Sequence, residues 1–137
     1  MTRGLTRSVI LDAEAVSSLT KAHRHVLASL KASIATDAEV MYPTIVLTEL
    51  LTGNPSDASI WRVVNGIEAV DLTSAIAAQA GYLRERAEKV RHKKRDLTVD
   101  AVVAATAVAW APSVIITSDP EDLKLLTDGH DVRVLPV

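Results

Sequence analysis

The chain has 137 residues, of which 48% are apolar, and it contains no cysteine. This length and apolar content predict one folded domain over residues 1–137 and exclude a disordered chain. The absence of cysteine excludes disulfides, thiolate metal sites and a cysteine nucleophile. The net charge of −2 favours no class of partner. Because we find neither a signal peptide nor an apolar segment of membrane-spanning length, we expect a cytoplasmic protein with no membrane partner.

Short apolar runs predict strands, and apolar residues at every third or fourth position predict helices. Taken in chain order, the strands are expected at 8–11, 39–42, 67–72, 113–117 and 132–135. The helices are expected at 13–20, 22–35, 44–52, 57–65, 74–91, 98–110 and 120–127. Strands that alternate with helices are typical of a parallel sheet with helices on both faces. The sequence therefore predicts an α/β fold with a mostly parallel sheet of about five strands.

The longest predicted helix combines a core stripe with a basic end. Its apolar stripe is expected to be buried, and its charged residues, Arg91 among them, are expected to face outward; the stripe consists of Ile76, Ala80, Leu83, Ala87 and Val90. Residues 84–95 carry seven Lys or Arg and two Glu, a local charge of +5. Such a segment is a candidate phosphate-binding patch, for which we name Arg91, Lys93, Lys94 and Arg95. A solvated helix face is the alternative.

Four acids are expected to meet at one edge of the sheet. Asp12 and Asp119 follow two predicted strands, and Asp100 directly precedes the uncharged run 101–116. Glu49 lies about one turn inside the helix that follows Pro43, although a surface glutamate at the edge of an apolar stripe would show the same spacing. Carboxylates gathered in this way repel one another, and oxygen ligands without cysteine or paired histidine suit Mg²⁺ or Mn²⁺.

Five motifs in this order resemble the PIN domain, and in particular the VapC-type toxins of bacterial toxin–antitoxin pairs. They are Val9-Ile-Leu-Asp12, Pro43-Thr-Ile-Val-Leu-Thr-Glu49, Thr98-Val-Asp100-Ala-Val-Val-Ala-Ala-Thr-Ala, Val114-Ile-Ile-Thr117-Ser-Asp119-Pro-Glu-Asp122-Leu and Val132-Arg-Val-Leu-Pro136. The resemblance covers nearly the whole chain and implies a three-layer α/β/α fold. It also implies an Mg²⁺- or Mn²⁺-dependent endoribonuclease that hydrolyses RNA with a metal-activated water, is usually a homodimer and is inhibited by a cognate antitoxin.

In this family Asp12, Glu49, Asp100 and Asp119 would be the catalytic, metal-binding acids, and Thr117 would support them by hydrogen bonding. The sequence departs from the family pattern at Glu14, where a small polar residue is common.

Two further acids, Asp96 and Asp122, are candidate extra ligands. A helix cap explains Asp96 equally well, and a capping box at the start of helix 120–127 explains Asp122.

Two alternatives to a nuclease remain open at this point. A phosphoacceptor receiver domain would need a lysine at the end of a late strand, and residues 132–136 contain none. A catalytically silent PIN-fold module that binds RNA or protein would keep the fold, and the four acids do not favour it.

Overall fold

A parallel sheet of five strands forms the centre of the computed structural model, which describes residues 6–21, 30, 37–91 and 96–137. The strands are β1 (Ser8–Leu11), β2 (Glu39–Pro43), β3 (Glu68–Val70), β4 (Ser113–Thr117) and β5 (Val132–Pro136). Their order across the sheet is β3-β2-β1-β4-β5, and each of the four pairings is parallel. The predicted number and direction of the strands are therefore confirmed.

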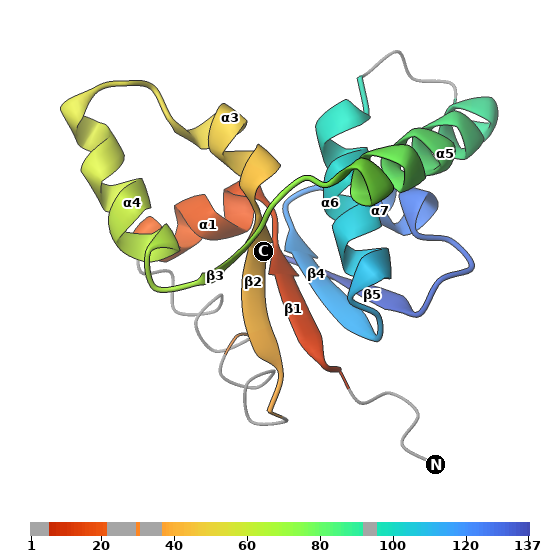
Figure 1. Cartoon of the computed structure of the whole chain (residues 1–137), viewed down its shortest axis with the longest axis horizontal. Coiled ribbons are helices and arrows are strands. Elements are labelled where there is room, and N and C mark those ends of the chain that lie inside the picture. The colour runs from red at the N-terminus through yellow and green to blue at the C-terminus, as the bar shows by residue number, and fades with distance from the viewer. Residues whose placement is uncertain (1–5, 22–29, 31–36, 92–95) are drawn as a thin grey trace.

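Helices cover both faces of this sheet. They are α1 (Ala13–Thr20), the 3₁₀ helix η1 (Thr44–Val46), α3 (Leu47–Leu50), the 3₁₀ helix η2 (Pro55–Asp57), α4 (Ala58–Val64), α5 (Ser74–Val90), α6 (Thr98–Ala109) and α7 (Pro120–Leu126). Figure 1 shows α1, α3 and α4 on the left of the sheet and α5, α6 and α7 on its right. The architecture is the three-layer α/β/α arrangement that the sequence predicted. Helix 22–35 lies outside the described residues except for the buried Leu30.

The core is built around β1, β4 and α6. Every residue of β1 and β4 is buried, as strands in the middle of a doubly covered parallel sheet should be. In α6 all residues from Ala101 to Ala107 are buried, because this helix packs between α5 and the sheet. Within the ranges that the structure describes, no helix is both long and apolar enough to cross a membrane.

Two large apolar residues lie at the surface, and one of them, Val90, was expected in the core. Val90, the last residue of α5, is 62% exposed, and Trp110, which follows α6, is 44% exposed. Both stand at helix ends. The other four members of the predicted stripe on α5 are buried, so the helix faces the core as expected.

The helix expected at 44–52 is shorter and less regular than predicted. It begins as η1, becomes α3 and ends when Leu51 turns to an extended conformation. Gly53 has a φ of +81°, but it serves a later turn rather than the helix end. The carboxylate of Asp57 closes that turn, since it accepts hydrogen bonds from the backbone N–H groups of Thr52 and Gly53 at 3.0 and 2.7 Å. Gly53 therefore does not cap this helix.

Candidate active site

The order of the strands creates a crevice between β1 and β4. From β1 the chain continues to β2 on one side, whereas from β4 it continues to β5 on the other. In open parallel sheets, ligands bind at such a switch point, just beyond the carboxyl ends of the strands. Leu11 and Ile116 are paired across β1 and β4, so Asp12 and Thr117 emerge side by side at this edge.

Asp12 is buried at the start of α1, with 8% of its surface exposed. Its carboxylate accepts a hydrogen bond from the backbone N–H of Ala15 at 2.9 Å, so it also caps the helix. Burial raises the pKa of Asp12, although hydrogen bonds from the Thr117 hydroxyl and from the N–H groups of Ala15 and Ser118 oppose the rise. A cation beside this carboxylate would favour its charged form.

Thr117 connects the acids of the two central strands. Its side chain is fully buried, and its hydroxyl donates to the carboxylate of Asp12. The same oxygen accepts a hydrogen bond from the backbone N–H of Asp119 at 2.9 Å. The supporting role that the resemblance implied for Thr117 therefore has a physical basis.

All four acids predicted to bind metal line one cavity of about 290 Å³. Asp12 and Asp119 follow β1 and β4, Asp100 lies in the first turn of α6, and Glu49 reaches the cavity from α3 as an exposed side chain. In Figure 1 α3 and the beginning of α6 lie above the carboxyl ends of the central strands. Four elements distant in sequence thus deliver their acids to the same space.

The donor set of this cavity fits a hard divalent cation. Single oxygens of Asp100, Asp119 and Asp122 lie within 4.8 Å of one another, and Asp12 and Glu49 line the same cavity. The Oδ2 atom of Asp100 is buried and accepts no hydrogen bond from the described residues, although Asp100 makes another interaction. Carboxylate oxygens at this density suit Mg²⁺ or Mn²⁺, and the acids would repel one another without positive charge nearby.

Asp122 has a partner that the sequence did not indicate. Its Oδ2 forms an ion pair with Nη2 of Arg91 at 3.0 Å, and the two side chains are only 11% and 9% exposed. The expectation that Arg91 faces outward as part of the basic patch is therefore wrong. The predicted capping box is also absent, because the N–H of Asp119 donates to Thr117 rather than to Asp122.

The remaining candidates divide between the cavity and the surface. Asp96 precedes the N-cap of α6 and accepts hydrogen bonds from the backbone N–H and the hydroxyl of Thr98, the first residue of the helix, at 2.9 and 2.7 Å, and it does not line the cavity. Those bonds lower the pKa of Asp96, with the hydroxyl of Thr98 as the main cause. Glu14 does line the cavity, so this departure from the family pattern adds an acid to the site. Lys93, Lys94 and Arg95 lie outside the described residues.

Comparison with solved structures finds several chains with the same fold. A chain of VapBC2 from Rickettsia felis, solved with a DNA fragment from the promoter, superposes with a TM-score of 0.72 at 16% identity, over 95% of this chain and 98% of that one. A chain of DNA-bound VapBC from Salmonella typhimurium gives 0.70 at 17% identity, over 94% and 97%. A chain of FitAcB from Neisseria gonorrhoeae gives 0.63 at 22% identity, over 93% and 96%.

At these identities the likeness establishes the fold, and it confirms the PIN-like architecture predicted from the sequence. No protein-family model and no curated protein sequence matches the chain.

Proposed function

We propose that this chain is a metal-dependent endoribonuclease of the VapC type, the toxin of a toxin–antitoxin pair. The observation that carries the proposal is that Asp12, Glu49, Asp100 and Asp119 line one cavity at the switch point of a PIN-like sheet. Fold alone does not determine function, so the weight rests on these side chains and their arrangement. An RNA substrate also suggests a cytoplasmic location.

In the proposed reaction, a water attacks the phosphorus of an RNA phosphodiester and the 3′ oxygen departs. The products carry a 5′-phosphate and a 3′-hydroxyl. Asp12, Glu49, Asp100 and Asp119 would hold Mg²⁺ or Mn²⁺, which makes a bound water more acidic and offsets the negative charge that develops at the phosphate. Thr117 fixes Asp12 relative to Asp119. None of these residues needs to act as a nucleophile.

Partners follow from the same proposal. The solved structures with this fold include complexes named VapBC and FitAcB and one described as a toxin–antitoxin complex from Klebsiella pneumoniae. We infer that this chain binds a cognate antitoxin and forms a homodimer. Lys93, Lys94 and Arg95 would hold the RNA backbone near the acids through their positive charge.

The proposal is tested by incubating the purified chain with single-stranded RNA in Mg²⁺, in Mn²⁺ and in EDTA. We expect cleavage with either ion, none in EDTA, and products with 5′-phosphate ends. Asp100→Asn and Asp119→Asn should abolish cleavage, whereas Asp131→Asn, at an exposed position that does not line the cavity, should retain it. Cleavage that persists in EDTA or in Asp100→Asn would contradict the mechanism. A folded wild-type chain that binds RNA without cleaving it would favour the silent module.

A further inference from the structure

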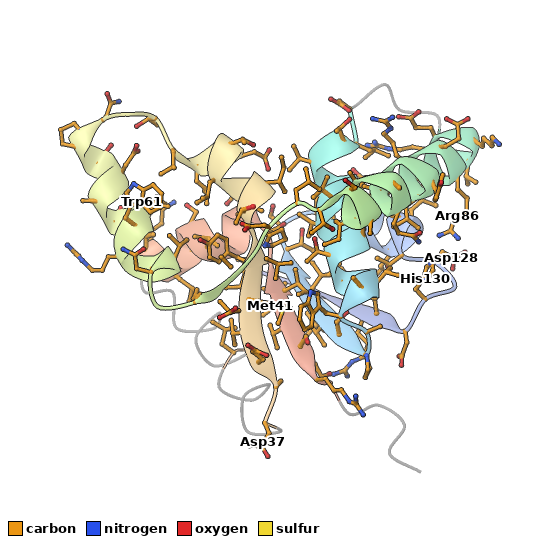
Figure 2. All side chains as sticks on the ribbon, viewed as in Figure 1. Asp37, Met41, Trp61, Arg86, Asp128 and His130 are labelled. Carbon is orange, nitrogen blue, oxygen red and sulfur yellow. The ribbon has the colours of Figure 1, made fainter. Side chains whose placement is uncertain are left out.

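Three arginines, two in α5 and one directly after it, contact the two helices that follow. Arg84 donates to the hydroxyl of Thr98 at the start of α6, at 2.9 Å. Arg86 donates to the carbonyl oxygens of Leu126 and Asp128 at the end of α7, at 3.2 and 2.8 Å. Figure 2 shows Arg86 and Asp128 close together at the right of the molecule. Arg91, which follows α5, binds Asp122 in the first turn of α7.

The ion pair of Arg91 differs from the other two contacts because it reaches the acid cluster. An oxygen of Asp122 lies within 4.8 Å of oxygens of both Asp100 and Asp119, which is close enough for all three to share an ion. Yet Asp122 Oδ2 is held by the guanidinium of Arg91 at 3.0 Å, and both side chains are about nine-tenths buried. Removing either partner of such a buried pair leaves the other charge buried without compensation, which strongly destabilises the fold.

We propose that Arg91 is a positioning residue that acts as a fixed counter-charge for the acid cluster and keeps Asp122 from becoming a ligand of the metal ion. This inference rests on the proposed metal-dependent function. The affinity of carboxylate sites for divalent cations depends on how many charged ligands they offer. A guanidinium fixed beside the cluster both removes one ligand and repels the incoming ion. Arg91 therefore weakens binding of the divalent ion.

The inference is tested by titrating the full chain with Mn²⁺, using calorimetry and the electron paramagnetic resonance signal of free Mn²⁺. Arg91→Met should bind Mn²⁺ about tenfold more tightly. Mutations of residues that hydrogen-bond to metal ligands change metal affinity about 10- to 100-fold, and this expectation is at the lower end of that range. Its melting temperature in EDTA should fall, because Asp122 loses its counter-charge. The double variant Arg91→Met with Asp122→Asn should return both values towards wild type. Arg91→Lys, which keeps the charge, should retain the wild-type affinity.

Arg86→Met is the matched control, since Arg86 also joins α5 to α7 but binds only carbonyl oxygens there. It should lower the melting temperature equally with and without Mn²⁺ and leave the affinity unchanged. Unchanged or weaker Mn²⁺ binding by Arg91→Met would overturn the inference and leave Arg91 as a brace for α7. A double variant that keeps the tight binding would overturn it as well. If the folded wild-type chain binds no Mn²⁺ at all, the proposed function fails instead.

Discussion

Asp12 and Thr117 are joined by a hydrogen bond across the switch point of the sheet, with the hydroxyl of Thr117 as donor. The same hydroxyl oxygen accepts from the N–H of Asp119 at 2.9 Å. One fully buried side chain thus sets the relative position of two acids that follow different strands. The binding of an ion between such acids depends on the spacing of their carboxylates, because Mg²⁺ requires a nearly ideal ligand geometry.

Replacing Thr117 by Val should therefore impair both the site and the fold. Val keeps the shape but leaves the partly buried N–H of Asp119 without its acceptor, at a cost of about 1 kcal/mol in the free energy of unfolding. We expect RNA cleavage to fall about 10- to 100-fold, as when other partners of metal ligands are removed. Urea unfolding and initial cleavage rates measure the two effects.

Thr106→Val provides the control for this variant. Thr106 is equally buried, but its hydroxyl donates to the carbonyl oxygen of Val102 within α6 and does not line the cavity. Its replacement should alter stability and leave the cleavage rate per folded molecule unchanged. Thr117→Ser should retain most activity, since it keeps the hydroxyl. Equal loss of activity in both Val variants would mean that Thr117 acts through stability alone.

Asp12 should make the stability of the metal-free protein depend on pH. Burial raises the pKa of Asp12, so the folded chain binds this proton more tightly than the unfolded chain. The resulting stabilisation is complete below the unfolded pKa of about 3.9 and is lost as the pH rises through the raised folded pKa. In EDTA, Asp12→Asn should therefore match wild type at low pH and become the more stable protein towards neutral pH.

The measurement is urea unfolding of both proteins in EDTA at several pH values. Asn is as good a helix cap as Asp, so the cap to Ala15 is kept and the comparison isolates the charge. Asp12→Ala should instead lose about 1 kcal/mol of cap energy at every pH. A difference between wild type and Asp12→Asn that does not vary with pH would refute the burial argument.

Glu49 should matter for activity and hardly at all for stability. It is an exposed acid of the cavity, on the short helix α3, and has little packing to lose. Glu49→Gln should leave the free energy of unfolding within about 0.5 kcal/mol of wild type while cleavage is lost. Glu121→Gln, an exposed acid in the first turn of α7 outside the cavity, should change neither. Full activity of Glu49→Gln would remove Glu49 from the proposed metal ligands.

The sequence predicted the strands and the meeting of the acids because both depend on local pattern and on topology. Buried parallel strands are continuous apolar runs, and parallel strands bring their carboxyl ends to one edge. Asp12 and Asp119 follow such runs directly, so their place could be inferred. Helix ends were predicted less well. Val90 was part of the predicted apolar stripe of α5 and is 62% exposed, and the pattern of one helix does not show how far neighbouring elements cover it.

The pairing of Arg91 with Asp122 could not be predicted from local pattern. In sequence, Arg91 belongs to a basic run and Asp122 has the spacing of a capping box, so each residue had a sufficient local explanation. Their contact depends on how α5 packs across α7, which is a tertiary relationship. The excess of acids at the switch point was the available signal, because crowded carboxylates require positive charge nearby.

The charge of residues 93–95 should be needed for RNA binding. Replacing Lys93, Lys94 and Arg95 together by Gln should weaken binding to single-stranded RNA and reduce its salt dependence, by about 2 units in the slope of log K against log [salt]. Arg91 is left unchanged because Asp122 occupies its guanidinium. Binding is measured by fluorescence anisotropy in EDTA, with no cleavage expected, over a range of salt concentrations.

The matched control replaces three exposed cations on other parts of the chain, Lys21, Arg62 and Lys124, by Gln. It removes the same charge from the protein as a whole, so any general electrostatic effect is shared by the two triple variants. Only the variant in 93–95 should show the reduced salt slope, because cations that contact phosphate release counterions whereas cations that do not contact it release none. Equal slopes in the two variants would show that this segment does not contact the RNA backbone.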